Sequence, residues 1–341
     1  MKTPLSILTI IIVLSALLFP NDGVKLKIKI LSEKDIIDRE ELLEKNEIFY
    51  RDLKGLDMDE HNHLYYLASH FVRIFKVDKD SLKLIKTISE KGQGPSELHT
   101  PLGFSVKNDR IFVYDMGFSG IKIFDTNGGC VKEIKFHDLN FLSLNIHIAH
   151  LIDANDKNEI YLRDIDDNNN TAISVFDLEG KKIKTMVPIN ADRNKDSKLW
   201  VLNTNFEFKL DNDGNIIILY LKKGLLKKLD KNGVLIWERN LYDDLPRADK
   251  TPEKFEVINK KRRFQFTVRL DFMGLCTAEN NDIFVSSHKG GFYYDKSGKP
   301  LFILKQPSGK GFGTILLLHK NELITPDKIY KLNYILGEGN D

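Results

Sequence analysis

Several features are scarce in this sequence of 341 residues, and each scarcity narrows the class of protein. It has only two cysteines, Cys130 and Cys276. A disulfide needs α-carbons within about 7 Å. The two thiols fall in different copies of the repeat described below, so we expect each to be a small packing residue. Charge of one sign is not in excess, with 51 basic and 49 acidic residues, so nothing suggests a nucleic-acid partner.

Enzyme motifs and long apolar runs are also missing. The chain has no Gly-x-Ser-x-Gly, His-Glu-x-x-His or phosphate-binding glycine loop. The longest uncharged run, Leu5 to Phe19, has 15 residues, whereas a spanning helix needs about 20. Residues 1–23 are therefore predicted to be a cleaved signal peptide, with a retained anchor or a buried strand as alternatives. We expect an exported protein, periplasmic, cell-surface or secreted, with residues 5–19 as a membrane tether if they are retained.

What the chain does contain is a unit of four short strands. Strands are expected at Leu102–Val106, Arg110–Tyr114, Ile121–Phe124 and Cys130–Phe136, with tight turns between them. Four such strands make one antiparallel sheet. A single sheet of this size cannot bury both of its faces, so it needs neighbours of its own kind.

The unit occurs six times. Each copy has an apolar residue at the centre of its second strand and an Asp or Asn that closes its third. The pairs are Tyr65 and Asp78, Phe112 and Asp125, Tyr161 and Asp177, Ile217 and Asp230, Phe284 and Asp295, Leu323 and Asn333. Spacing within a unit is nearly constant and the connections vary, as expected of blades joined by surface loops. The sequence predicts an all-β fold, a six-bladed β-propeller of four-stranded antiparallel blades, as a single domain over residues 24–341.

The N-terminal part of this domain is expected to close the ring. Val24 to Leu31 alternates apolar residues with lysine, which is typical of a strand with one wet face. The last unit lacks a fourth strand after Leu336. The N-terminal strand is therefore predicted to complete the final blade, which removes two open sheet edges. Residues 35–46 are expected to form a short helix or turn that leads to blade one.

Residues Gly94 to Ile134 resemble an NHL repeat, which runs from a Gly-Pro turn through a Tyr-Val-x-Asp strand to a Val-Phe-Asp-x-x-Gly strand. The segment Gly92-Gln93-Gly94-Pro95-Ser96-Glu97-Leu98 also resembles the signature of six-bladed propellers, of uncharacterised role, that bacteria export. The resemblance extends over about residues 56–336 and implies the fold. It implies no single activity, because propellers include binding modules, lyases and hydrolases. It also implies that the loops after the second strands lie on one face with the long connections, around the central channel.

Charged and polar residues follow the second strands. The candidates for binding a ligand or partner there are Ser69, His70, Asp115, Arg163, Asp164, Lys222, His288 and Asp327. The alternative is that they are solvated hairpin ends or, for Asp115, a side chain bonded to its own turn. The acids Asp115, Asp164 and Asp327 are also a weak candidate set for a metal, with calcium as the alternative to no cofactor at all.

Tyr242 to Val268 is the longest connection between blades, and such connections often carry function. Thr251 and Pro252, followed by acids and then by a basic run, predict a helix there. Arg262 and Arg263 in that run are further candidates for contact with an anionic partner. Two other patterns are interpreted as ordinary turns: the calcium-like Asp211 to Asn215, and His61-x-His63.

No nucleophile, base and orienting residue come together in the sequence. It therefore favours a non-catalytic module that binds a protein, peptide or carbohydrate. The alternative is a metal-dependent lyase or hydrolase with its site at the channel, and a purely structural envelope component is a third hypothesis.

Overall fold

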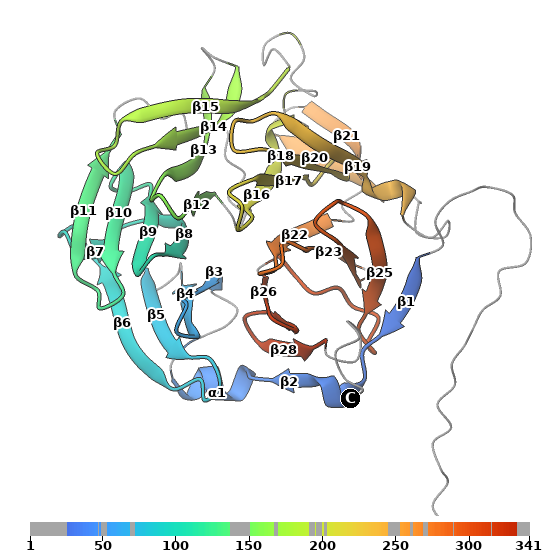
Figure 1. Ribbon diagram of the computed structural model, residues 1–341, viewed down its shortest axis with the longest axis horizontal. Coiled ribbons are helices and arrows are strands. Elements are labelled where there is room, and N and C mark those ends of the chain that lie inside the picture. The colour runs from blue at the N-terminus through green and yellow to red at the C-terminus, as the bar shows by residue number, and fades with distance from the viewer. Residues whose placement is uncertain are drawn as a thin grey trace, which may run out of the picture.

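The computed structural model describes residues 26–46, 48, 53–68, 72–136, 151–166, 170–190, 195, 200, 203–244, 253–259, 262–268, 272–288, 290–314 and 316–332. It is a six-bladed β-propeller, and the blades follow one another round the ring in chain order (Figure 1). Each blade is an antiparallel sheet whose first strand is the innermost. The predicted all-β class and the predicted number of blades are confirmed.

The strands of the first three blades lie where the repeat pattern predicts them. Blade one contains β3 (Leu53–Met58), β4 (His63–Ala68), β5 (Arg73–Asp78) and β6 (Leu84–Lys91), with β7 (Glu97–Leu98) added in parallel to β6. Blade two contains β8 (Pro101–Lys107), β9 (Arg110–Asp115), β10 (Gly120–Asp125) and β11 (Cys130–Lys135). Blade three contains β12 (Ile152–Ala154), β13 (Ile160–Asp166), β14 (Thr171–Phe176) and β15 (Lys182–Pro188).

The other three blades continue the pattern, with more variation at the end of the chain. Blade four contains β16 (Phe206–Leu210), β17 (Ile216–Tyr220), β18 (Leu225–Leu229) and β19 (Leu235–Asn240). Blade five contains β22 (Phe272–Thr277), β23 (Ile283–Ser287), β24 (Gly290–Tyr294) and β25 (Pro300–Lys305). Blade six has three strands from the C-terminal part of the chain: β26 (Leu317–His319), β27 (Glu322–Ile324) and β28 (Lys328–Lys331).

The Asp that closes the third strand has a structural role. In blade two, Asp125 Oδ1 accepts hydrogen bonds from the backbone N–H groups of Asn127 (2.8 Å) and Gly129 (2.9 Å). The equivalent acids of blades three, four and five make the same pair of bonds. Gly128 between them has φ +84°, a conformation that glycine adopts without strain. The repeated acid thus fixes the turn into the fourth strand.

The core lies between neighbouring blades. Phe112 and Tyr114 of blade two, for example, pack in one cluster with Ile152, Ile160 and Phe176 of blade three, and all five side chains are buried. Each blade therefore covers the apolar face of the next, which is what the sequence requires of a sheet too small to stand alone.

The N-terminal segment closes the ring, as predicted, but residues 36–38 complete blade six in place of the predicted strand at residues 24–31, which adds to blade five. β1 (Lys27–Ile30) lies parallel to β25 of blade five. After the short 3₁₀ helix η1 (Glu33–Asp35), β2 (Ile36–Asp38) pairs antiparallel with β28 and gives blade six its fourth strand. The predicted short helix follows as α1 (Glu40–Lys45). Within the described residues, no helix has the length and apolar character to cross a membrane.

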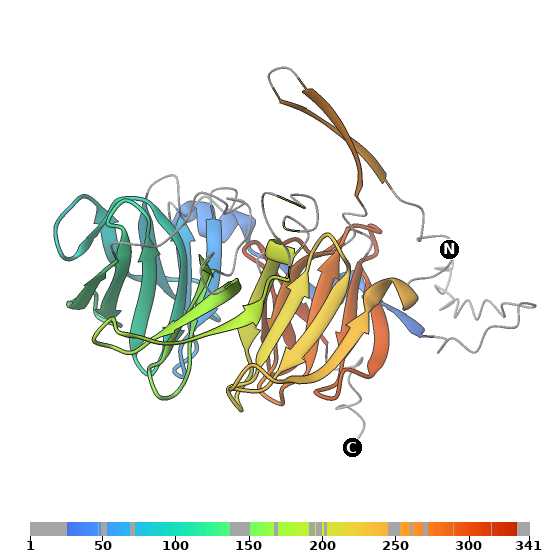
Figure 2. The same ribbon diagram turned by 90° about the horizontal axis from the view of Figure 1, so that it is seen from above.

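The helix predicted in the Tyr242–Val268 connection is wrong. After the 3₁₀ helix η3 (Leu241–Asp243), the described part of the connection is a hairpin of β20 (Glu253–Asn259) and β21 (Arg262–Val268), which projects from the disc in Figure 2. Both segments are rich in β-branched and aromatic residues that alternate with polar ones, a pattern that favours strands. Phe255 pairs with Phe266 across the hairpin. The expected cap, Thr251 and Pro252, lies outside the described residues.

Candidate functional site

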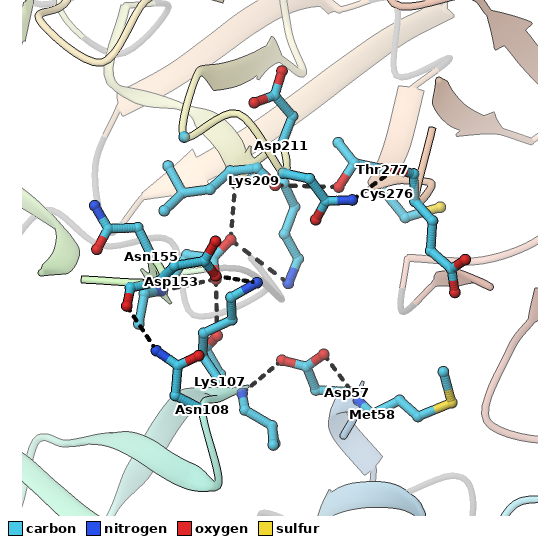
Figure 3. Close-up of a pocket in the computed structure, with 18 of the residues that line it drawn as sticks. Asp57, Met58, Lys107, Asn108, Asp153, Asn155, Lys209, Asp211, Cys276 and Thr277 are labelled. Atoms are coloured by element: carbon cyan, nitrogen blue, oxygen red, sulfur yellow. Dashed lines mark hydrogen bonds and ion pairs between the residues drawn. The ribbon is translucent and has the colours of Figure 1, made fainter. Parts of the chain in front are cut away.

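A cavity of about 820 Å³ opens at the centre of the ring (Figure 3). Its lining comes from the last residues of the innermost strands β3, β8, β12, β16, β22 and β26 and from the turns that follow them. We call this end of the channel the cavity mouth. In an antiparallel blade successive turns lie at alternate ends, so the loops after the second strands form the opposite mouth.

Four equivalent positions supply the polar centre of the cavity. Asp57, Asp153, Lys209 and Cys276 are each the last residue but one of their innermost strand. All four line the cavity together with Ser105 of β8. Side chains alternate along a strand. These residues therefore line the channel, while the apolar residues next to them in the same strand pack between blades.

Asp57 joins blades one and two. Its Oδ2 accepts a hydrogen bond from the N–H of Val106 (2.8 Å), and its Oδ1 accepts one from the N–H of Met58 (2.9 Å). Burial raises the pKa of this carboxyl. The ammonium of Lys209 opposes that effect, and the carboxylate of Asp153 adds to it.

Asp153 joins three blades. Its Oδ1 accepts hydrogen bonds from Ser105 Oγ in blade two (2.8 Å) and from the N–H of Ala154 in its own blade (2.9 Å). Its Oδ2 accepts one from the N–H of Leu210 in blade four (2.9 Å). The oxygens of both central carboxylates are thus already used to hold neighbouring blades together.

Lys209 differs from the two acids. Its Nζ lies 4.0 Å from Asp153 Oδ2, and its side chain is only 12% exposed. No hydrogen bond from this ammonium to another described residue is present in the structure. Burial lowers the pKa of Lys209, but the carboxylates of Asp153 and Asp57 outweigh burial and hold the pKa above its usual value. The cavity therefore contains a charged ammonium with unused donors.

The rim of the cavity carries charges of both signs and, among the described lining residues, no Phe, Tyr or Trp. Its exposed acids are Glu60, Asp109, Asp156, Asp213 and Glu279, and its exposed lysines are Lys157, Lys231 and Lys320. Sugars commonly bind against aromatic faces, so the lining favours a ligand recognised by charge and hydrogen bonds.

The calcium-like segment at this rim is an ordinary turn, as predicted. Asp211 Oδ1 accepts from the N–H groups of Asp213 (3.0 Å) and Asn215 (2.8 Å), while Oδ2 pairs with Lys228 Nζ at 2.8 Å. In the turn of blade one, His63 Nδ1 lies 2.9 Å from Asp59 Oδ2. The described residues contain no group of three or more His, Cys, Asp or Glu arranged to hold a metal ion.

None of the described binding candidates Asp115, Arg163, Asp164, Lys222, His288 and Asp327 lines this cavity; they lie at the opposite mouth or between blades. Asp115 is fully buried and accepts from the N–H groups of His99 (2.7 Å), Thr100 (2.7 Å) and Gly117 (3.0 Å). This is the backbone-bonding alternative for Asp115.

Arg163 and Asp164 are also buried. Arg163 donates to the carbonyl of Thr204 in blade four at 2.5 Å. Asp164 accepts from Ser174 Oγ (2.7 Å) and pairs with Lys182 (3.1 Å).

The remaining candidates do not form a cluster with these. Burial lowers the pKa of Lys222, which is half-buried, and His288 is exposed. Asp327 Oδ1 accepts from Thr325 Oγ1 at 3.0 Å. Ser69 and His70 lie outside the described residues, and of Arg262 and Arg263 only the backbone, in β21, is described. A binding role for these residues stays a prediction.

The glycine-proline signature also has a structural role. Lys122 of β10 is 2% exposed, and its Nζ donates to the carbonyls of Gly94 (2.7 Å) and Glu97 (2.7 Å). Glu133 completes the site with an ion pair of 3.2 Å. The signature segment therefore wraps a buried ammonium and leads the chain from blade one to blade two.

Sequence reasoning missed the central residues Asp57, Asp153 and Lys209. Their signal is weak but present: each is a charge near the end of a short, otherwise largely apolar first strand. Because the first strand is innermost, such a charge must face the channel or be buried between blades. Recognising this requires the radial order of the strands, which the alternation alone does not give.

The family of the chain can be stated from a direct comparison. Residues 44–231, more than half of the chain, match the model of a family described as a domain of unknown function, DUF4221. The chain belongs to this family. No curated protein matches the chain.

Solved structures similar to this DUF4221 chain include three at low identity. Virginiamycin B lyase from Staphylococcus aureus has 9% identity and a TM-score of 0.47, over 86% of this chain and 96% of that one. A protein of unknown function from Bacteroides caccae has 11% identity and a TM-score of 0.44, over 74% of this chain and 81% of that one. Nidogen, in a complex with laminin, has 11% identity and a TM-score of 0.47, over 76% of this chain and 83% of that one. At these identities and TM-scores, nothing about the function of this chain follows.

Proposed function

We propose that the protein is a non-catalytic binding propeller that acts outside the cytoplasm and takes a small polar ligand into the cavity mouth. The single observation that carries this proposal is the cavity of about 820 Å³ at the centre of the ring, with charged side chains at its centre. Cavities of about 300–1,000 Å³ are the usual size for ligand sites. The short apolar segment near the N-terminus supports export.

The chemistry of the lining supports binding and does not require a reaction. Asp57 and Asp153 are held by backbone amides of neighbouring blades. Cys276, which also lines the cavity, is buried, and burial raises the pKa of its thiol well above the usual range. A thiol in this state is a poor nucleophile. The rigid ring thus presents fixed hydrogen-bonding groups to a ligand.

The proposal is tested by titrating a panel of short peptides, amino acids and oligosaccharides into the purified protein by isothermal titration calorimetry. The double variant Glu60→Trp, Lys157→Trp narrows the cavity mouth at two exposed positions. His288→Trp is the matched control, because His288 is exposed outside the cavity lining. We expect at least one panel member to bind wild type and His288→Trp equally and to be lost in the double variant. The proposal fails if no member binds, or if only His288→Trp reduces binding.

A further inference from the structure

We infer that Lys209 receives the carboxylate of a ligand at the centre of the cavity, and that the ligand is the C-terminal end of a short basic peptide. The inference rests on the proposed function and names the class of ligand for the same cavity. It depends on the unused donors of Lys209, on the hydrogen bonds that already hold the neighbouring acids, and on the charges of the rim.

The first step concerns the unused donors of Lys209. An ammonium has three N–H donors, and at 4.0 Å the contact with Asp153 is an ion pair without a hydrogen bond. The Nζ atom of Lys209 faces the cavity, so its unused donors are open to solvent or to a ligand. By contrast, the other buried lysine described above, Lys122, donates to two carbonyls and pairs with a carboxylate. Lys209 is thus the buried cation of the cavity that is ready to accept a partner from outside the chain.

The second step concerns the type of acceptor. An anionic oxygen is the strongest partner for an ammonium, because charge-assisted hydrogen bonds are shorter and stronger than neutral ones. The carboxylates of Asp57 and Asp153 do not replace it, since they are held in place by Val106, Met58, Ser105 and Leu210.

The third step concerns the rest of the ligand. Two acids of the rim are already paired, Asp156 with Lys107 and Glu279 with His319. The lining as a whole still carries ten Asp and Glu residues against six lysines, which favours positive groups at the entrance. The described lining has no aromatic ring on which a sugar would stack. The side-chain amides of Asn155 and Asn212 and the hydroxyl of Thr277 already donate within the protein. A basic peptide that enters by its C-terminus places its ammonium groups near the acids of the rim and its carboxylate at Lys209.

The test uses trilysine with a free C-terminal carboxylate, trilysine amide, triglutamate and free lysine, each titrated into the full-length protein at low salt. Trilysine should bind at least tenfold more tightly than its amide and than triglutamate. In Lys209→Met the acid and the amide should bind equally, so the discrimination disappears, while Lys209→Arg should keep part of it. Lys222→Met, which removes a lysine outside the cavity lining, should behave as wild type.

The other outcomes overturn the inference. If wild type binds acid and amide alike, or if Lys209→Met still discriminates, Lys209 does not hold the carboxylate. Equal affinity for lysine and trilysine assigns the cavity to an amino acid, and tighter binding of triglutamate reverses the assigned charge. Thermal melting of each variant checks that it is folded. If trilysine fails but another panel member binds in the cavity, the proposed function survives without this ligand class.

Discussion

The two mouths of the channel contain similar residue types but use them differently. At the opposite mouth, Asp115 is buried and bonded to three backbone amides of its own and the preceding connection. On the same side, Lys122 is enclosed by the carbonyls of the signature segment. At the cavity mouth, Lys209 is almost as buried but makes only a 4.0 Å contact. Charge alone does not mark a site; a charge whose bonding capacity the fold leaves unused does.

The closed ring is a condition for this comparison, and opening it should have the largest effect. Deleting residues 24–31 removes β1 and Leu31, which is 2% exposed and packs in the core of blades five and six. We expect the melting temperature to fall by about 10 °C, since the lost pairing of β1 with β25 adds to the about 2–5 kcal/mol that one buried leucine contributes. Deleting residues 24–38 also removes β2 and should lower it further, because β28 becomes an open edge.

Circular dichroism melting of the two deletions checks this order. An unchanged melting curve in the shorter deletion would mean that β1 contributes nothing to closure. Equal curves in both deletions would mean that blade six is stable with three strands.

Asp115→Ala should have the next largest effect and should not affect ligand binding. It leaves three backbone N–H groups without their acceptor, so we expect a loss of about 3–5 kcal/mol in the free energy of unfolding. Urea denaturation gives the value. His288→Ala is the control, because His288 is exposed just after β23 of blade five, and we expect it to change the free energy of unfolding by less than about 0.5 kcal/mol. A normal stability with lost binding would return Asp115 to the list of ligand-binding residues.

Lys122 and Lys209, two lysines with little exposed side-chain surface, give the most direct comparison. Lys122→Met should cost about 2–4 kcal/mol, because two carbonyls and Glu133 lose their partner. Lys209→Met should cost less, about 1–2 kcal/mol, because no hydrogen bond of the ammonium is lost and an alkyl chain of similar length remains, although Asp57 and Asp153 lose the cation beside them. Both values come from urea denaturation at neutral pH. Equal losses would show that the fold itself depends on the ammonium of Lys209.

The fold could be predicted because the sequence patterns that indicate it are local. The spacing of Tyr65, Phe112 and Ile217 from the Asp that follows each of them reflects a hairpin and its capped turn, both of which depend on neighbours in the chain. The hairpin β20–β21 was missed because the Thr251-Pro252 cap and the charge order were given more weight than strand alternation. Short basic runs fit a tight turn as well as a helix end.

The candidate site was less predictable, because it depends on contacts between blades. The role of Asp153 follows from bonds to Ser105, 48 residues away, and to Leu210, 57 residues away. Each separation is close to one repeat of the chain, but the repeat pattern does not show which side chain bonds across to the next blade. Sequence alone also could not show that Asp115 and Asp164 are already bonded within the protein. Both lie at the end of a second strand, where an acid without such bonds would be free to bind a ligand.

Asp57 should make the stability of the protein depend on pH through the cavity mouth. Its pKa lies above the ordinary 3.8 in the folded protein. As pH rises from that value through the raised pKa, the folded protein holds a proton that the unfolded chain has lost, so stability falls. In Asp57→Asn this loss is absent. The difference in unfolding free energy, variant minus wild type, should therefore increase as pH rises through this interval. Urea titrations at a series of pH values measure it, and a constant difference would show that the pKa is not raised.

Replacing the hairpin should have the smallest effect on stability. β20 and β21 pair only with each other among the described strands, so they belong to no blade. We expect a short glycine-serine link in place of residues 253–268 to change the free energy of unfolding by less than about 0.5 kcal/mol, because loop length has a weak effect on closure entropy. The hairpin follows the fourth strand of blade four and so lies towards the opposite mouth. Trilysine should therefore bind as in wild type. Lost binding would mean that one ligand contacts both ends of the ring, and the separation of the two mouths would then be wrong.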